Sequence, residues 1–318
     1  MAEWLYEDGI GEERAALVED GAIIEARIDR DDNRIRAGDV VAARLKRKAG
    51  RAGRGEVELQ GGAIALLAPV PSGLTEGAPL TVEIVREAIP ERGNPKLPLA
   101  RPSDEPIRPA PALRESLDES GIPVRIIPPH GPDLLEEAGW SELLEQAESG
   151  LVPFAGGLLR IALTPAMTVI DVDGELLPAE LAARGAAAAA QAIRRFDIGG
   201  SIGLDLPTLP DKRARQAAAD ALDAALPQPF ERTAVNGFGF LQIVRRRLRP
   251  SLMELIQSDP VRAGAFALLR RLEREPLPGP DSVPAPAPVA RLIASRPDWS
   301  ADLARRRGRA IRIEATVS

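Results

Sequence analysis

Apolar residues in the first hundred positions follow the spacing of β-strands. The run RAALVEDGAIIEARID (14–29) contains two β-prone segments on either side of Asp20-Gly21, a pair typical of tight hairpin turns. Further short apolar runs follow, separated by Gly and Pro, at 56–59, 63–70 and 80–85. Short strands with such turns predict a small β-barrel over about 36–100.

The pattern changes after residue 100. Residues 101–112 are rich in Pro and predict a linker. Between 113 and 150 we expect short helices around one strand at 124–127.

Strand and helix patterns alternate most clearly between residues 151 and 250. The expected elements are strands at 158–163 and 166–172, a helix from Pro178 to about Phe196, a strand at 201–206, a helix from Pro210 to Leu226, and strands at 232–236 and 240–247. This alternation predicts a layered α/β unit. After Pro250 we expect a helix, a second Pro-rich linker at 276–288 and a final strand at 310–317.

A chain of 318 residues exceeds one ordinary hydrophobic core. We therefore predict a multidomain fold of the α+β or α/β class. The expected parts are an N-terminal hairpin segment (1–35) packed on the later α/β part, a barrel (36–100), a linker region (101–150), an α/β domain (151–254) and a small C-terminal α/β domain (255–318).

The chain has no cysteine, which excludes disulfide frameworks, thiolate zinc sites and cysteine nucleophiles. Its first residues, MAEWLYEDGIGEE, are acidic and lack the apolar segment of a signal peptide. No run of eighteen apolar residues occurs, so we expect no membrane-spanning segment. These features predict a cytoplasmic protein.

The formal net charge is −6, which argues against indiscriminate binding to phosphates. Basic residues are nevertheless concentrated in three runs, at 44–54, 245–249 and 305–312. Each run is either a solvated face or a contact for a nucleic acid. The single histidine, His130, lies in a turn-like PPHG context and is expected to be exposed or structural.

Aspartates end two of the predicted strands, in TVIDVDGE (168–175) and IGLDLPTL (202–209). Because successive strand residues face opposite sides, Asp171 and Asp173 share one face, about 7 Å apart. The same rule places Asp205 on the outward face of its strand. Asp205 can therefore meet Asp171 if the two strands are neighbours.

Two interpretations of these aspartates stay open from the pattern alone. Clustered carboxylates repel one another unless a cation or a proton lies between them, and Mg²⁺ is commonly held by one or two carboxylates. That arrangement is the minimum for metal-assisted phosphodiester hydrolysis. Alternatively, Asp173-Gly174 forms a hairpin turn and Asp205 simply ends a strand.

Three ordered segments resemble the bacterial ribonuclease E/G family. LTPAMTVIDVDGE (163–175) is similar to its catalytic strand, DIGGSIGLDLPTL (197–209) to its second aspartate motif, and VNGFGFLQIVRRRLRPSL (235–252) to the arginine-rich segment that follows. Residues 14–30 also resemble the family's opening hairpin. These four stretches comprise 61 of the 318 residues.

This resemblance implies a Mg²⁺-dependent endoribonuclease that cleaves single-stranded RNA and leaves 5′-phosphate and 3′-hydroxyl ends. It implies a deoxyribonuclease-I-like catalytic domain over 151–254, a degenerate S1-like oligonucleotide-binding barrel over 36–100 and a ribonuclease-H-like remnant within 101–150. The implied catalytic residues are Asp171 and Asp205, with Asp173 as a further metal ligand. Candidate RNA contacts are Lys46, Arg47, Lys48, Lys212, Arg213, Arg245, Arg247 and Arg249.

The chain also departs from the family in several places. Without cysteine it cannot form the family's zinc link between protomers, so no zinc is expected and any homo-oligomer must form in another way. The helix after the first aspartate carries Arg184-Gly185-Ala186 in place of an Asn-x-Glu motif. Residues 40–90 contain no Phe, Tyr, Trp or His for base stacking. These differences leave a second hypothesis, an RNA-binding adaptor with little or no catalysis.

Overall fold

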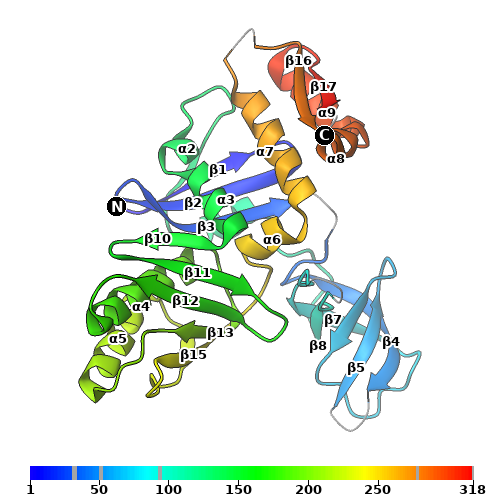
Figure 1. Ribbon diagram of the computed structural model, residues 1–318. Coiled ribbons are helices and arrows are strands. Elements are labelled where there is room, and N and C mark those ends of the chain that lie inside the picture. The colour runs from blue at the N-terminus through cyan, green and yellow to red at the C-terminus, as the bar shows by residue number, and fades with distance from the viewer. Residues whose placement is uncertain (31–33, 50–52, 92–94, 277–278, 317–318) are drawn as a thin grey trace.

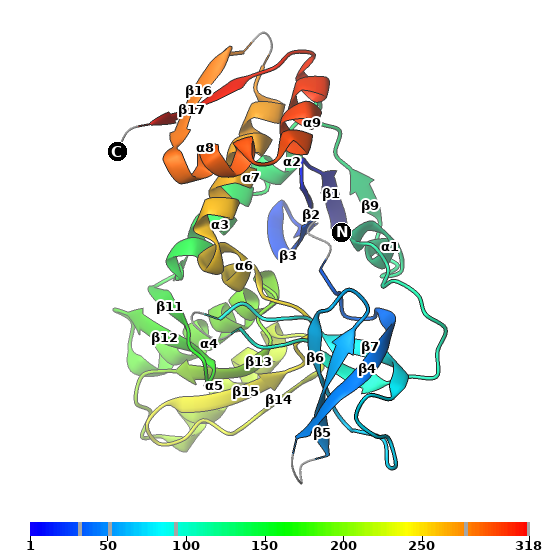
Figure 2. The same ribbon diagram turned by 90° about the vertical axis from the view of Figure 1, so that its right-hand side faces the viewer.

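The computed structural model describes residues 1–30, 34–49, 53–91, 95–276 and 279–316. It is a mixed α+β structure that contains a closed five-stranded barrel and sheets of four, six and two strands. In Figure 2 the two-stranded sheet and its helices lie at the top, the four-stranded sheet lies below them, and the barrel and the six-stranded sheet lie side by side at the bottom.

The four-stranded sheet combines the first thirty residues of the chain with a strand that follows the barrel. Its strands are β1 (Glu3–Asp8), β2 (Glu12–Glu19), β3 (Ala22–Arg30) and β9 (Val124–Ile126), in the order β3-β2-β1-β9. The hairpin turn predicted at Asp20-Gly21 is confirmed, since both residues have the positive φ angles of 51° and 79° that such turns require. The strand predicted at 124–127 is also present and runs parallel to β1.

The predicted barrel is confirmed. Its strands are β4 (Val40–Ala49), β5 (Arg54–Leu59), β6 (Ile64–Leu67), β7 (Pro79–Arg86) and β8 (Leu99–Pro102), closed in the order β4-β5-β6-β8-β7. Alternate residues such as Leu45, Val57 and Ile84 point inward and are fully buried. Small and branched aliphatic side chains therefore fill the barrel interior.

The six-stranded sheet follows the linker region. Its strands are β10 (Leu151–Phe154), β11 (Gly157–Leu163), β12 (Thr168–Gly174), β13 (Gly200–Asp205), β14 (Phe230–Arg232) and β15 (Phe240–Arg245), in the order β10-β11-β12-β13-β15-β14. Within it β12 and β13 are parallel, and the other neighbouring pairs are antiparallel. Helix α4 (Pro178–Arg195) connects the parallel pair, and α5 (Lys212–Ala225) follows β13.

One face of this sheet is covered and the other is largely exposed. Helix α4 packs against β10, β11 and β12, and α5 packs on α4. Ile170 and Val172 on β12 are buried in this core, which also receives apolar side chains from β1 to β3. Asp171 and Asp173 alternate with these two residues along β12 and therefore face the other way, toward solvent.

The remaining helices connect these sheets (Figure 1). They are α1 (Leu113–Asp118), α2 (Leu134–Glu137), α3 (Trp140–Ser149), α6 (Leu252–Ser258), α7 (Pro260–Arg274), α8 (Ala287–Ala294) and α9 (Pro297–Arg307). Helix α6 crosses the predicted boundary at residue 254, and its side chains join the core of the six-stranded sheet. None of the helices in the described part of the chain combines the length and apolar character that a membrane span requires.

Two predicted elements are wrong. The strand expected at 232–236 is instead β14 at Phe230–Arg232, because the side chain of Asn236 turns the chain by accepting hydrogen bonds from two backbone N–H groups further on. The linker expected at 276–288 contains β16 (Ser282–Pro286), which pairs in parallel with β17 (Arg312–Thr316). Pro is tolerated there because the sheet has only two strands, so one edge of β16 needs no N–H donors. Residues 277–278 of that linker lie outside the described residues.

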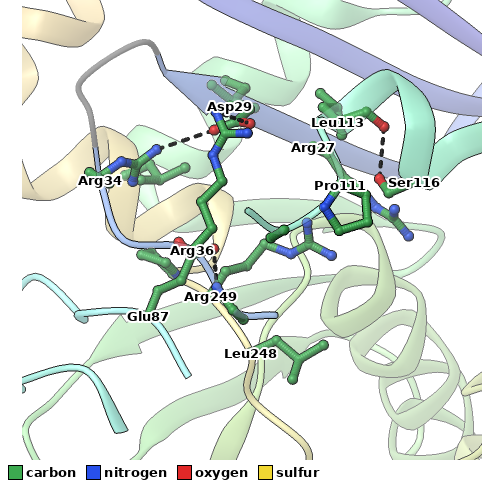
Figure 3. Close-up of a pocket in the computed structure, with 15 residues that line it drawn as sticks. Arg27, Asp29, Arg34, Arg36, Glu87, Pro111, Leu113, Ser116, Leu248 and Arg249 are labelled. Carbon is green, nitrogen blue, oxygen red and sulfur yellow. Dashed lines mark hydrogen bonds and ion pairs between the residues drawn. The ribbon is translucent and has the colours of Figure 1, made fainter. Parts of the chain in front are cut away.

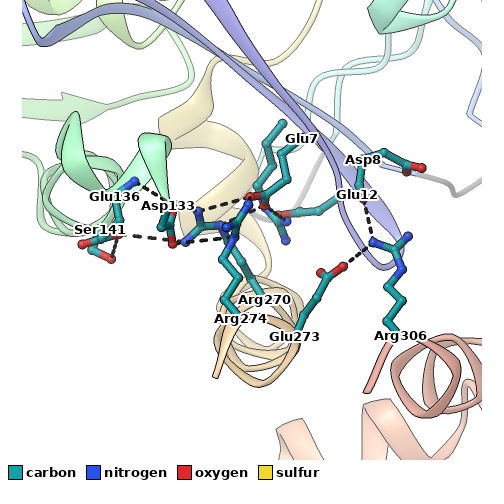
Figure 4. Close-up of polar contacts among 11 residues, drawn as sticks. Glu7, Asp8, Glu12, Asp133, Glu136, Ser141, Arg270, Glu273, Arg274 and Arg306 are labelled. Atoms are coloured by element: carbon teal, nitrogen blue, oxygen red, sulfur yellow. Dashed lines mark hydrogen bonds and ion pairs between the residues drawn. The ribbon is translucent and has the colours of Figure 1, made fainter. Parts of the chain in front are cut away.

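Buried charges join the N-terminal sheet to α7, as Figure 4 shows. The carboxylate of Glu7 accepts hydrogen bonds from Arg14 Nη1 at 2.8 Å, Arg270 Nε at 2.9 Å and Arg274 Nε at 2.8 Å. Arg270 also binds Asp133, the N-cap of α2. The contacts of Glu7 with Arg270 and Arg274 connect parts of the chain more than 250 residues apart, and all three side chains are at least nine-tenths buried.

Candidate functional site

Asp171 and Asp205 lie opposite each other on the neighbouring strands β12 and β13. The two strands are parallel, and their register pairs the Cα of Asp171 with that of Asp205. Both side chains belong to the solvent-facing side of the sheet. Asp205 is the last residue of β13 and Asp171 is the middle residue of β12, and together they form the last pair of the parallel register, at its carboxyl end. Open α/β sheets commonly bind ligands at this edge.

The electrostatics of this pair disfavour two negative charges. Partial burial, together with the nearby carboxylates of Asp173 and Asp205, raises the pKa of Asp171, while Arg160 acts in the opposite direction. Among the described residues, neither Asp171 nor Asp205 has an ion-pair partner. A bound cation would relieve this repulsion.

Asp173 is held by a cation from the neighbouring strand. Its Oδ2 accepts a hydrogen bond from Arg160 Nε at 2.6 Å, in a pair that is about half exposed. The alternative in which Asp173-Gly174 forms a hairpin turn is wrong, because both residues continue β12 and pair with Leu158 and Gly157 on β11. The negative charge of Asp173 is therefore partly offset within the protein.

The donor set limits which metal the site could hold. In the described part of the chain, no group of three or more His, Cys, Asp or Glu residues has the arrangement of a metal site. Two carboxylates without a third ligand fit Mg²⁺, which usually keeps several waters and takes one or two carboxylates. They do not fit zinc, which prefers nitrogen and sulfur ligands, or calcium, which takes six to eight oxygens.

Two candidate RNA contacts follow the strand that carries Asp205 in the chain. Lys212 and Arg213 begin α5, after the six residues 206–211 that follow β13, and both side chains are exposed. Asp211 caps the helix by accepting hydrogen bonds from the backbone N–H groups of Arg213 and Ala214. The two cations are therefore on a fixed helix start that follows the strand carrying Asp205 in the chain.

Three other candidate contacts lie at the opposite end of the sheet. Arg245 pairs in register with Gly200, whereas Phe240, five residues earlier, pairs with Asp205. This register separates Arg245 from the aspartates by about 17 Å along the strand. Arg245 and Arg249 bind Asp197, at 2.9 Å and 3.2 Å, and Arg247 binds Glu254. The structure thus does not bring these arginines to the aspartates, and carboxylates of the protein offset their charges.

Two cavities lie beside these arginines. Arg249 lines one of about 160 Å³ together with Arg27, Arg34 and Arg36, and Figure 3 shows Asp29 and Glu87 among its lining residues. Arg245 and Arg247 line a second cavity of about 470 Å³ between the sheet and the barrel. The arginines of the first cavity are interleaved with these acidic residues, so its charge is partly balanced.

The basic residues of the barrel are exposed and remote in sequence from the aspartates. Lys46, Arg47 and Lys48 lie on β4, and Arg47 forms an ion pair with Glu56 on β5. Residues 50–52 of the predicted basic run at 44–54 lie outside the described residues. In the run at 305–312 several arginines form ion pairs within the C-terminal part, with Asp302, Glu273 and Asp281. His130 is exposed, as predicted.

Two residues beside the aspartates were not predicted from the sequence. Arg160 becomes visible only through the register of β11 and β12, which no sequence pattern reveals. Phe238 had a usable signal, because it is an aromatic residue between two glycines in VNGFGF and its side chain is 81% exposed. An aromatic residue in a turn-forming context is not part of a core pattern.

The comparisons with known proteins add no family assignment. A scan against protein-family profiles finds no family that matches this chain. A search of curated proteins likewise finds no matching relative. The resemblance to the ribonuclease E/G family therefore stays a prediction that rests on the quoted segments.

Proposed function

We propose that this protein is a Mg²⁺-dependent endoribonuclease that hydrolyses phosphodiester bonds in single-stranded RNA. The observation that carries the proposal is the pairing of Asp171 with Asp205, at the carboxyl end of the stretch over which two parallel strands pair. The choice of RNA as substrate rests on the resemblance of the surrounding segments to ribonucleases. We further propose that the barrel is a degenerate S1-like oligonucleotide-binding barrel and that 151–254 is a deoxyribonuclease-I-like domain.

The two aspartates have a defined task in this proposal. Their carboxylates would hold a Mg²⁺ ion, which usually keeps water and phosphate as further ligands. When bound, Mg²⁺ would polarise a phosphoryl oxygen and make a water more acidic, and the proposed products carry a 5′-phosphate and a 3′-hydroxyl. Both aspartates must be ionised to act as ligands, and the raised pKa of Asp171 shifts this requirement toward higher pH.

A second function is favoured by different observations. Arg160 is engaged by Asp173, and the three arginines at the far end of the sheet are engaged by Asp197 and Glu254. Few of the candidate cations at the sheet are thus free for phosphate contacts. This arrangement supports an RNA-binding adaptor that uses the exposed basic residues of β4 and α5 without catalysis.

The test uses a labelled, A/U-rich single-stranded RNA with Mg²⁺ or with EDTA. We expect cleavage that requires Mg²⁺ and falls at least about 100-fold in Asp205→Asn, because the variant removes one of two carboxylate ligands. The matched control is Asp104→Asn, an exposed aspartate on the segment after the barrel, which should cleave like the wild type.

The products and the binding distinguish the two functions. Fragments that can be ligated through a 5′-phosphate and extended from a 3′-hydroxyl support the hydrolase. Intact RNA under every condition, with equal binding by wild type and Asp205→Asn, would replace it by the adaptor.

A further inference from the structure

Phe238 is an aromatic side chain that the fold leaves uncovered. The chain has six Phe, three Trp and one Tyr, and all of them lie among the described residues. Only Phe238 among these has an exposed ring, at 81%, and the others are buried or partly buried. A single exposed apolar residue is common in proteins and does not by itself indicate a function. The position of Phe238 and the rigidity of its loop are what indicate one here.

The position of Phe238 is next to the carboxylate pair. Two residues later Phe240 begins β15 and pairs in register with Asp205. Between them the carbonyl of Gly239 accepts a hydrogen bond from Leu206 N at 3.2 Å, directly after Asp205. Phe238 is therefore attached to the backbone that forms the edge of the proposed site.

The loop that carries Phe238 is held in one conformation. Asn236 Oδ1 accepts hydrogen bonds from the backbone N–H groups of Phe238 at 2.9 Å and Phe240 at 3.1 Å. Gly239 has a φ of +94°, and a Cβ there would overlap the backbone oxygen of Leu206, so only glycine fits. A ring on such a loop loses little conformational freedom on binding.

We propose that the ring of Phe238 stacks on an unpaired base of the RNA strand whose phosphate lies at Asp171 and Asp205. This inference rests on the proposed function and adds a base-contacting residue to it. Every base has a π face, so an exposed aromatic ring can stack without reading the sequence. The exposed cations Lys212 and Arg213, at the start of the helix that follows Asp205 in the chain, suit the phosphates of that strand.

The barrel offers no aromatic ring for base stacking. Residues 40–90 have no aromatic side chain and no histidine, so stacking platforms are absent from the part of the fold that resembles a nucleic-acid-binding barrel. Base stacking therefore has to come from the six-stranded sheet. Phe238 is the residue there whose ring is available.

The test measures the fluorescence of 2-aminopurine placed in turn at each position of a short single-stranded RNA. The full-length protein carries Asp205→Asn, so that the RNA stays intact. We expect quenching at one or two adjacent positions, retained in Phe238→Tyr and lost in Phe238→Ala and Phe238→Leu. The affinity for RNA should fall about tenfold in the last two variants.

The controls separate stacking from other roles of an apolar side chain. Ile126→Ala, an exposed apolar residue on β9 of the other sheet, should leave quenching unchanged. All variants should keep the wild-type melting temperature, because Phe238 is exposed. Equal quenching in Phe238→Leu, or sedimentation that shows self-association dependent on Phe238 without quenching, would overturn the proposal.

The same experiment distinguishes its failure from that of the proposed function. Ring-dependent quenching in a protein whose wild type cleaves no RNA would support the stacking role and refute the hydrolase. Mg²⁺-dependent cleavage that is unaffected by Phe238→Ala, with unchanged quenching, would refute the stacking role and leave the hydrolase standing.

Discussion

Asp171 is the residue whose ionisation the fold opposes most clearly within the candidate site. Burial and the carboxylates of Asp173 and Asp205 raise its pKa above the usual range. A raised pKa means that the folded state binds the proton more tightly than the unfolded state does. The free energy of unfolding therefore decreases as the pH rises through the pKa of Asp171.

Asp171→Asn should accordingly be more stable than the wild type at pH 7 and of equal stability at pH 3, where the carboxyl is protonated in both states. Urea unfolding at the two pH values measures the difference. Such a gain in stability together with a loss of activity is typical of substitutions at functional residues. A variant that is less stable than the wild type only at pH 7 would contradict the pKa direction.

Asp197 shows the opposite behaviour. Burial alone would raise its pKa, but Arg249 and Arg245 hold the pKa of this carboxyl below its usual range. Its contribution to stability is present above the unfolded pKa of about 4 and is lost as the pH falls through the lower, folded value.

Asp197→Asn should lower the free energy of unfolding at pH 7 by about 2–3 kcal/mol, because two partly exposed arginines lose their partner. Thermal or urea unfolding checks this value. Asp223→Asn, which breaks the more exposed pair with Arg232, should cost less than about 1 kcal/mol. An equal decrease in the free energy of unfolding in the two variants would mean that the ion pairs of Asp197 stabilise the fold no more than the exposed pair of Asp223 does.

At the scale of elements, the contact of α4 with β12 fixes the strand that carries Asp171. Gly185 lies where the helix is closest to the sheet, and a Cβ there would overlap the side chain of Val172. The missing side chain allows the close approach of the helix to the strand.

Gly185→Ala should therefore destabilise the protein by about 1–3 kcal/mol, although Ala favours helices, because the added methyl group overpacks this contact. Gln191→Ala, on the exposed side of the same helix, should change stability by less than about 0.5 kcal/mol. Denaturant unfolding of both variants makes the comparison. If Gly185→Ala is as stable as the wild type, α4 can move away from β12.

The elements also show what a single sequence can reveal. The turn at Asp20-Gly21 and the strands around Asp171 and Asp205 were predictable, because local alternation and turn residues determine them. The strand Ser282–Pro286 was not, since its prolines suggest a linker and only the partner β17 makes it a strand. The position of Arg245 was also hidden, because alternation gives the face of a residue but not its distance from a site on another strand.

At the scale of the whole molecule, Glu7 connects the N-terminal sheet to α7. Burial acts to raise its pKa, but Arg14, Arg270 and Arg274 lower the pKa below the usual range. This stabilisation is present above about pH 4.5 and is lost as the pH falls through the folded pKa. Acid should therefore loosen the attachment of α7 to the sheet.

Glu7→Gln should reduce the free energy of unfolding at pH 7 by about 3–5 kcal/mol, because buried arginines would be left without their carboxylate. Glu3→Gln on the same strand, with a distant and exposed partner in Arg125, should cost less than about 1 kcal/mol. Urea unfolding checks both. An unchanged free energy of unfolding in Glu7→Gln would mean that the ion pairs of Glu7 do not stabilise the contact between the N-terminal sheet and α7.

The central claim is that Asp171 and Asp205 act as one site. The most direct test is a double-mutant cycle that measures single-turnover cleavage of single-stranded RNA in Mg²⁺ by the wild type, Asp171→Asn, Asp205→Asn and the double variant. We predict that each single variant loses nearly all activity and that the double variant is no worse than either, as for residues that function as a unit. Losses that simply multiply in the double variant, or full activity in either single variant, would contradict the claim.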